Sequence, residues 1–288
     1  MKTLNIIGAG RVGRSLGHLW HKHGVFEVQD VLTRSQASAA EAVSFIGAGR
    51  AVTQMSDMRA ADVWMLAVPD DQIRSMAIKL LKTEIAGVFM ASNAIIFHCS
   101  GAMSTTELQA LRDTGSQLAS AHCLLSFSAP SSAVTQFKGT PCALEGHALA
   151  KQTLQPAFEA IGATCFEIAE KDKILYHAAA VFATNFLPVL QVVAADLWRS
   201  SGMPESMIAP LNASLLQKAA QNISAQGAAK ALTGPAARGD AALVELQGKA
   251  VAEWNVQAGL AYSALSQLAA QIAKDGTIHS QNQNSINQ

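Results

Sequence analysis

The sequence predicts an α/β domain with a doubly wound, mostly parallel sheet, followed by an all-helical domain. Short β-rich runs alternate with helix-like runs as far as Ile168, and no convincing strand pattern follows Glu170. A length of 288 residues also fits two domains, at roughly 150 residues each. We therefore expect the first domain at residues 1–169 and the helical domain at 170–276. Residues 277–288 are rich in Gln, Asn and Ser and should be disordered.

Periodicity and turn residues place the individual elements. The expected strands are Thr3–Ile7, Val28–Thr33, Arg50–Thr53, Asp62–Val68, Ile95–Cys99, Gln117–His122, Cys142–Glu145 and Thr164–Ile168. The helices expected between them are Arg11–His23, Ala37–Phe45, Asp71–Lys82, Thr105–Asp113 and Ala148–Ile161. Helical periodicity in the second domain covers Asp172–Ser200, Pro204–Ala225 and Ala241–Lys274, with a break at Gly234-Pro235. Ser104 and Glu107 fit a capping box before the fourth helix.

The composition is that of a globular protein without a nucleic-acid partner. Hydrophobic residues make up 50% and charged residues 15%, which excludes a disordered chain. Lys plus Arg equals Asp plus Glu, at 21 each, so the basic excess typical of nucleic-acid binders is missing. The four cysteines form no CxxC pair, which predicts reduced thiols, no metal site and a cytoplasmic location.

One apolar stretch, Ala178 to Trp198, is long enough to suggest a membrane span. It contains Asn185, Pro188, Gln191 and Asp196, which are costly in lipid. We therefore expect no membrane partner. Instead, Asp172–Ser200 should form one long buried helix that contributes to a two-fold homodimer interface.

The strongest local signal for a ligand is the sequence Gly8-Ala9-Gly10-Arg11-Val12-Gly13, which directly follows an apolar strand and opens a helix. In this GxGxxG pattern the first glycine permits a tight turn and the second admits a pyrophosphate. The third lets helix and strand pack closely. The unpaired N–H groups of the helix N-terminus then bind the phosphates. The sequence thus predicts a Rossmann-type dinucleotide site.

The end of the second strand favours NADP over NAD. An NAD site needs an acid at this position, whereas an NADP site needs a cation for the 2′-phosphate. Here Arg34 stands between the hydroxyls of Thr33 and Ser35. Asp30 is the competing candidate for an NAD ribose, although it lies inside the strand. The backbone of Val68 and Pro69, after the fourth strand, should pass along the cofactor.

Candidate catalytic residues follow the fifth and sixth strands, since ligands in such folds bind beyond the carboxyl ends of the strands. We expect His122 to exchange a proton with a substrate and Ser100 to orient it by a hydrogen bond. His98 lies inside its strand and should be structural. Asp70 or Asp71 is expected to cap the next helix.

The helical domain adds further candidates. His177 and Asn185 are expected to join the catalytic group, and Lys173, Thr233 and Arg238 to bind the substrate. A guanidinium such as that of Arg238 suits a substrate carboxylate. Two structural alternatives remain open: the polar groups of the first helix have partners in the core, or Arg238 forms a local ion pair with Asp240.

Seven segments in fixed order carry a resemblance: GAGRVG, LTRS, LAVPDDQI, FHCSGAMS, AHCLLSF, YHAAAVFATNF and LTGPAARGD. From Leu4 to about Ala270 the chain resembles a bacterial family of Rossmann-like proteins with a helical carboxyl-terminal domain of unassigned function. That family is similar to pyrroline-5-carboxylate reductases, ketopantoate reductases, prephenate dehydrogenases and deazaflavin-dependent NADP oxidoreductases. Some of its members look like alternative ketopantoate reductases.

The resemblance implies an NADP-dependent oxidoreductase, dimeric through its helical domain, with Ser100 and His122 at the positions of the prephenate dehydrogenase Ser and His. Two departures put the substrate in doubt. Cys123 replaces the usual Pro, and Leu243 to Leu246 lacks a His that the family usually has after the LTGPxxRGD turn.

The leading hypothesis is hydride transfer between NADP(H) and a small, anionic carbonyl or imine compound, ketopantoate-like or 2-keto acid-like. One alternative is an NADP(H)-binding sensor or regulatory protein without turnover. Hydride exchange with a deazaflavin, which needs a wide flat cleft, is a third.

Overall fold

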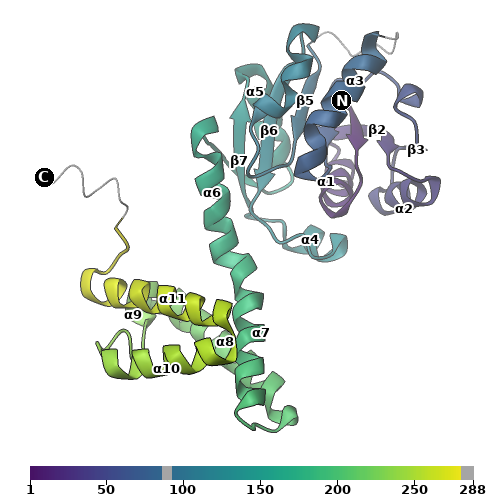
Figure 1. The fold of residues 1–288 in the computed structure, drawn as a ribbon. Helices are drawn as coiled ribbons and strands as arrows, with labels where there is room; N and C mark the ends of the chain where they lie inside the picture. The colour runs from purple at the N-terminus through teal and green to yellow at the C-terminus, as the bar shows by residue number, and fades with distance from the viewer. Residues whose placement is uncertain (86–92, 280–288) are drawn as a thin grey trace, which may run out of the picture. The chain divides into compact units, whose positions relative to one another are not determined.

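The protein is represented by a computed structural model that describes residues 1–85 and 93–279. It contains two compact units, Met1–Thr184 and Asn185–Gln288 (Figure 1). Most of the tail expected to be disordered, residues 280–288 of 277–288, lies outside the described residues.

The first unit is built on one eight-stranded sheet in the order β3-β2-β1-β4-β5-β6-β7-β8. The strands are β1 (Lys2–Ile7), β2 (Phe26–Leu32), β3 (Arg50–Val52), β4 (Val63–Leu66), β5 (Ile95–His98), β6 (Gln117–Cys123), β7 (Pro141–Gly146) and β8 (Thr164–Glu167). β1 to β6 are parallel, whereas β7 pairs antiparallel with β6 and parallel with β8. The strand order reverses between β1 and β4, the point at which such sheets bind ligands. The predicted fold class is therefore confirmed.

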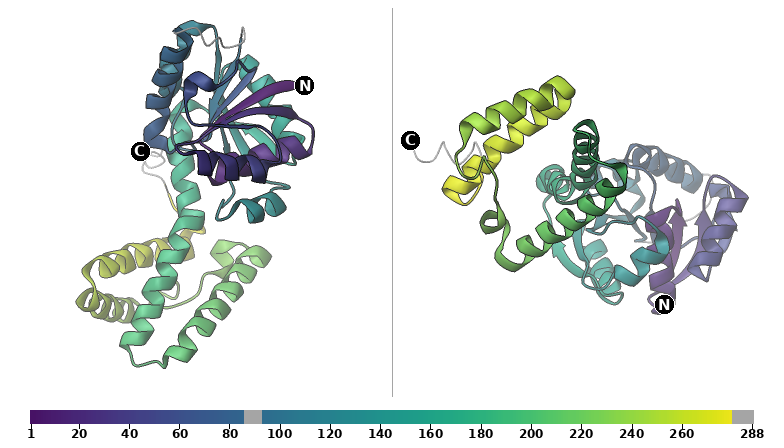
Figure 2. Two further views of the ribbon diagram at one scale, coloured as in Figure 1. Left: turned by 90° about the vertical axis from the view of Figure 1, so that its right-hand side faces the viewer. Right: turned by 90° about the horizontal axis from the view of Figure 1, so that it is seen from below.

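Helices cover both faces of this sheet (Figures 1 and 2). The helices of the first unit are α1 (Arg11–Lys22), α2 (Gln36–Ile46), α3 (Ile73–Ile85), α4 (Pro130–Gln136), α5 (Ala148–Glu159) and α6 (Lys173–Ala180). Residues of α1, α2 and α5 belong to one buried apolar cluster, and those of α3 belong to the other. The described region between α3 and β6 also contains η3 (Thr105–Thr114), which is a 3-10 helix where the sequence predicted an ordinary helix. Helix α4 was not predicted.

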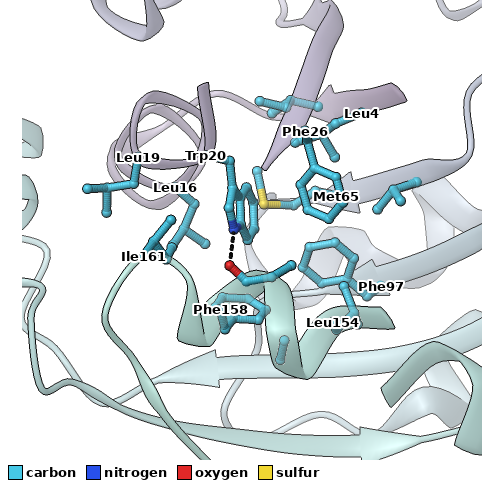
Figure 3. Close-up of a cluster of buried hydrophobic side chains, with 14 of the residues drawn as sticks. Leu4, Leu16, Leu19, Trp20, Phe26, Met65, Phe97, Leu154, Phe158 and Ile161 are labelled. Atoms are coloured by element: carbon cyan, nitrogen blue, oxygen red, sulfur yellow. Dashed lines mark hydrogen bonds between the residues drawn. The ribbon is translucent and has the colours of Figure 1, made fainter. Parts of the chain in front are cut away.

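Trp20 is the centre of the larger cluster (Figure 3). Its ring makes edge contacts with Phe26 and Phe158 at centroid distances of 5.3 and 5.1 Å. Its Nε1 donates to the Ala157 carbonyl at 2.9 Å, so the buried indole leaves no polar atom unsatisfied. This packing fixes α1, and with it the glycine turn at the N-terminus of α1, against the sheet and α5.

Described residues of the second unit form helices α7 (Phe186–Ser200), α8 (Glu205–Gln226), α9 (Ala228–Ala231), α10 (Ala241–Trp254) and α11 (Val256–Asp275). The predicted region Ala241–Lys274 is two helices, because Asn255 is extended and its side chain caps α11 through Ala258 N–H at 2.9 Å. These two helices pack closely at Gly259, where an added Cβ would lie 2.5 Å from Ala252 Cβ.

The segment expected to be one long buried helix is helical but largely exposed. Helical residues run from Glu170 to Ser200 and include a π-helical turn at Val181–Asn185. Lys173 is buried in α6, but no residue of α7 is buried. By length and composition alone this segment could also cross a membrane, with a mean hydropathy of 1.8 over its most apolar window. The expectation of burial is therefore wrong for the single chain.

His98, at the end of β5, fixes the loop that follows. It is fully buried; its Nε2 donates to the Ser104 carbonyl at 3.0 Å and its Nδ1 accepts from Ser100 N–H at 3.2 Å. Burial lowers the pKa of His98 to about 4, so the ring is neutral at pH 7. This agrees with the structural role expected from the sequence.

The buried histidine predicts a specific loss of stability in acid. Between pH 6.5 and 4 an unfolded chain protonates residue 98 but the folded chain does not, so acidification favours unfolding. From the pKa of about 4, the contribution lost between pH 7 and pH 5 is about 2 kcal/mol. Urea unfolding followed by circular dichroism should show a loss in the natural protein that is about 2 kcal/mol smaller in His98→Gln. The exposed-site control His21→Gln should keep the full loss, and an equal loss in all three proteins would contradict the assignment.

Candidate functional site

The glycine turn has the geometry that a pyrophosphate site requires. Gly8 adopts a positive φ of 83°, and a Cβ there would lie 2.7 Å from the Ala67 carbonyl oxygen. A Cβ on Gly13 would lie 2.5 Å from the Gly8 carbonyl oxygen, whereas one on Gly10 would meet nothing within 4 Å. Helix α1 begins directly after Gly10 without a side-chain cap, so its first N–H groups face open space.

A cavity of about 710 Å³ extends from this turn. Eight of the predicted cofactor residues line it: Gly8, Ala9, Gly10, Thr33, Arg34, Ser35, Val68 and Pro69. Arg11, Val12 and Gly13 do not line it and instead form the first turn of α1. Two lining cations, Arg14 and Lys79, were missed by the sequence analysis because they lie inside helices. Among the described residues, the lining includes three cations and no carboxylate.

Thr33 and Ser35 mainly shape the loop around Arg34. The Thr33 hydroxyl donates to the Ser35 carbonyl at 2.8 Å, and Ser35 Oγ caps α2 by accepting from Ser38 N–H at 3.3 Å. Arg34 itself is exposed and, in the described part of the chain, forms no ion pair or hydrogen bond. Its guanidinium is therefore available to an anionic ligand.

Asp30, the competing candidate for an NAD ribose, is occupied elsewhere. The carboxylate is fully buried and accepts from Arg50 Nε at 2.9 Å and from Arg59 N–H at 2.7 Å. Burial raises the pKa of Asp30, but hydrogen bonds from Arg59 and Arg50 outweigh this effect and hold the pKa below its ordinary value. The carboxylate is thus paired with two arginines of the protein and is not available to a ribose.

A second cavity, of about 160 Å³, lies beyond the carboxyl ends of β5 and β6. Polar lining residues come from four segments: Asp70 after β4, Ser100 after β5, His122 on β6 and His177 on α6. Gly101 lies between the two imidazoles, where an added Cβ would be 2.6 Å from His177 Cδ2 and 2.7 Å from His122 Cε1. A glycine is therefore required for the two histidines to approach each other.

The Ser100 side chain stabilises the loop in which it lies, whereas the sequence analysis expected it to orient a substrate. Its hydroxyl donates to Asp70 Oδ2 at 2.8 Å and accepts from Ala102 N–H and Met103 N–H at 3.2 and 2.9 Å. With its donor and both acceptor sites used, the hydroxyl has little capacity left to orient a substrate. Asp70 likewise binds Ser100 and does not cap the next helix by its side chain.

Lys173 is also internal rather than open to a substrate. It is fully buried, and its Nζ donates to the Ser100 carbonyl at 3.2 Å and to Ser120 Oγ at 2.8 Å. Ser120 donates in turn to the Glu145 carboxylate at 2.9 Å. Burial lowers the pKa of Lys173. The structure therefore corrects its predicted role in substrate binding: Lys173 holds the Ser100 loop and α6 in place.

His122 has the environment of a reactive group. Its Nδ1 lies 2.9 Å from the Tyr176 hydroxyl, and its Nε2 has no hydrogen-bond partner among the described residues. Burial, and next the nearby His177, lower the pKa of His122 to about 4. Tyr176 was missed by the sequence analysis, which considered its neighbours Lys173 and His177; the YHAAA segment, with one of only two tyrosines in the chain, was the available signal.

The remaining candidates are placed less centrally. His177 lines the second cavity, and its ring centroid is 5.7 Å from that of His122. Asn185, in the π-helical turn, is not part of the lining. Thr233 and Arg238 lie in the second unit, where Asp240 caps α10 and forms no ion pair with Arg238 in the described residues. Roles for Asn185, Thr233 and Arg238 stay predictions.

The four cysteines lie on or beside neighbouring strands as free thiols. Cys123 Sγ is 3.7 Å from Cys142 Sγ on the facing strand β7. Burial raises the pKa of Cys99 to about 12, which makes that thiol a poor nucleophile at neutral pH. No group of three metal-ligating side chains comes together in residues 1–85 and 93–279.

Comparisons with known structures show the same architecture. Protein TM1727 from Thermotoga maritima is 25% identical, with a TM-score of 0.72 over 95% of this chain and 99% of that one. A Bacteroides fragilis protein assigned as an NADP oxidoreductase, BF3122, is 18% identical, with a TM-score of 0.75 over 94% and 98%. An imine reductase from Myxococcus stipitatus, solved with NADP⁺, is 16% identical, with a TM-score of 0.64 over 95% of each chain.

No curated protein is significantly similar in sequence. Two family models nevertheless match: a Rossmann-like domain at residues 2–123 and a domain of unknown function (DUF2520) at residues 140–269. The chain thus carries a Rossmann-like domain followed by a DUF2520 domain.

Proposed function

We propose that the protein is an NADP-dependent oxidoreductase that transfers a hydride between NADP(H) and a small, anionic carbonyl or imine substrate. One observation carries this proposal: residues that are close together in the chain line both cavities. The first is the cavity beside the glycine turn, here called the nucleotide cavity, and the other is the second cavity, which contains His122. Pro69 lines the first and Asp70 the second, and Gly10 lines the first and Val12 the second. A dinucleotide on the glycine turn would therefore end close to His122. The similar structures of an NADP oxidoreductase and an imine reductase agree with this reaction class.

The residues present fit NADP better than NAD. Open space above Gly10 and uncapped N–H groups suit a pyrophosphate. Arg34 follows β2 and, among the described residues, is an unpaired cation where a 2′-phosphate would lie. Asp30 is not available to a ribose, because its carboxylate is bonded to two arginines. When bound, the cofactor supplies or accepts the hydride, and a side chain of the protein donates or accepts the proton.

His122 is the group proposed to exchange that proton. Its pKa of about 4 makes it neutral in the free protein at pH 7. In the reduction direction the imidazolium form gives its Nε2 proton to the product oxygen or nitrogen, and in the oxidation direction the ring takes this proton back at Nε2. An anionic substrate beside the ring raises its pKa, because the opposite charge favours imidazolium. This coupling supports a substrate that carries a negative charge.

The function predicts turnover that depends on His122. Purified protein should oxidise NADPH with at least one member of a panel of 2-keto acids, ketopantoate and cyclic imines. His122→Gln should lower kcat by about 100- to 10,000-fold, the usual loss when a general acid or base is removed. The exposed-site control His23→Gln should be unchanged. If the protein binds NADPH tightly but reduces no member of the panel, the result favours the alternative hypothesis of an NADP(H) sensor without turnover. Normal turnover by His122→Gln would overturn the role assigned to His122.

Cofactor selectivity should depend on Arg34. A hydrogen bond to a charged group contributes roughly 1.5–3 kcal/mol, or about 10- to 100-fold in affinity. Arg34→Ala should therefore weaken NADPH binding by about 10- to 100-fold and leave NADH binding nearly unchanged, as measured by fluorescence titration. Arg112→Ala, at an exposed arginine of η3, is the matched control. Equal weakening of both cofactors would show that Arg34 only supports the fold.

We also propose that the second unit forms a homodimer with a second copy of the chain. In its described part only Ile208 and Gly259 are buried. Large apolar side chains are exposed along α7, including Val189 and Val192 at 56% and 61%. Such a surface needs a partner in water, and the ion-paired Asp196, Arg199 and Glu205 beside it favour a protein surface over lipid.

Light scattering should therefore find a dimer at micromolar concentration without detergent. Placing a charge in the apolar surface should dissociate it, so Val192→Asp is expected to be monomeric. Leu149→Asp, at a leucine of α5 that is 56% exposed, should remain dimeric. A monomeric natural protein, or one that requires detergent to stay in solution, would contradict the dimer.

A further inference from the structure

In the hydrogen bond between Tyr176 and His122, the donor can be identified from the surroundings. The Tyr176 hydroxyl lies 2.9 Å from His122 Nδ1, and the two ring planes are perpendicular at a centroid distance of 5.6 Å. In the described chain this is the only hydrogen bond of the hydroxyl. If His122 Nδ1 donated the proton, the O–H of a half-buried tyrosine would have no acceptor, which is costly. The tyrosine therefore donates and His122 Nδ1 accepts.

The protonation states of both partners fit this direction. Burial raises the pKa of Tyr176, so the phenol keeps its proton at neutral pH. Burial lowers the pKa of His122 to about 4, so the imidazole carries one proton and not two. A neutral ring that accepts at Nδ1 must carry its proton on Nε2.

The surroundings leave Nε2 as the nitrogen that faces the second cavity. Gly101 lies along the Nδ1–Cε1 edge of the ring, since a Cβ there would lie 2.7 Å from Cε1 and 2.9 Å from Nδ1. His122 lines the cavity, and Nε2 is not bonded to any described residue. The Nε2–H is therefore the ring donor that stays available to a substrate oxygen or nitrogen in this cavity.

The fold places Tyr176 for this contact through its neighbour Lys173. The buried ammonium of Lys173 donates to Ser120 Oγ on β6, two residues before His122. Tyr176 follows Lys173 by three residues on α6, so both side chains lie on the same face of the helix. Holding Lys173 on β6 thus holds the Tyr176 hydroxyl at the imidazole.

We propose that Tyr176 is a positioning residue that fixes His122 in the Nε2–H tautomer, so that the ring presents a hydrogen-bond donor to the substrate. Its catalytic meaning rests on the function proposed above, but the tautomer is a property of the free protein. In the proposed reduction, Nε2–H hydrogen-bonds the carbonyl oxygen or imine nitrogen and stabilises the negative charge that develops there. When Nδ1 takes up a second proton from solvent, the ring gives the Nε2 proton to that oxygen or nitrogen and is left neutral with its proton on Nδ1. The tyrosine acts through His122 and does not itself touch the substrate.

Nitrogen NMR of histidine-labelled protein tests the proposal without turnover, because a protonated and an unprotonated ring nitrogen have different chemical shifts. The His122 signals are assigned by their loss in His122→Gln. In the natural protein at pH 7 we expect a proton on Nε2 and a bare Nδ1. A typical net hydrogen bond of about 0.5–1.5 kcal/mol implies that Tyr176→Phe lowers the Nε2–H to Nδ1–H ratio by about 2- to 10-fold.

The other tyrosine of the chain provides the control. Tyr262 donates to Gln247 in the second unit, so Tyr262→Phe should leave the tautomer unchanged. With an active substrate, Tyr176→Phe should lower kcat more than it changes KM. A proton on Nδ1 in the natural protein, or an unchanged ratio in folded Tyr176→Phe, would overturn the proposal. A confirmed tautomer in a protein that reduces no substrate would overturn the proposed function and leave the role of Tyr176 standing.

Discussion

The buried ammonium of Lys173 is the interaction on which the candidate site depends. Burying a charge costs several kcal/mol unless hydrogen bonds and opposite charges compensate. Here the Ser100 carbonyl and Ser120 Oγ accept from the ammonium, and Ser120 connects it to the Glu145 carboxylate. The requirement to satisfy one charge thus ties together the loop after β5, strands β6 and β7, and helix α6.

The same requirement determines what lies over the second cavity. Once Lys173 is fixed, the residues three and four positions later must lie on the same face of α6. These are Tyr176, which contacts His122 Nδ1, and His177, which lines the cavity. Gly101 completes the arrangement because any larger residue would collide with both imidazoles. A helix outside the sheet therefore contributes directly to the environment of His122.

The sequence could predict the features that depend on backbone pattern. The strands, the glycine turn and the position of Arg34 follow from periodicity, from glycine spacing and from the end of a strand, all of which are local. The role of Asp30 could be narrowed but not decided, because its arginine partners lie 20 and 29 residues later in the chain.

Features that depend on long-range hydrogen bonds could not be predicted. Ser100 looked available to a substrate because its three partners are apparent only when the loop is folded against Asp70. Lys173 was expected to bind the substrate, and the alternative of partners in the core could not be chosen from the sequence, since a buried lysine carries no local signal. The exposed surface of α7 shows a further limit: apolar periodicity predicts that a face is covered, but does not identify what covers it.

The charges of the two cavities suggest an order of events in the proposed reaction. The nucleotide cavity is cationic before anything binds, since Arg34 is free and Asp30 is neutralised by Arg50 and Arg59. The second cavity differs, because burial and the neighbouring His177 and Lys173 keep His122 neutral. A negative substrate is what would make protonation of that ring favourable. Binding of the substrate and protonation of His122 are therefore coupled. A proton becomes available for transfer only when the substrate that needs it is bound.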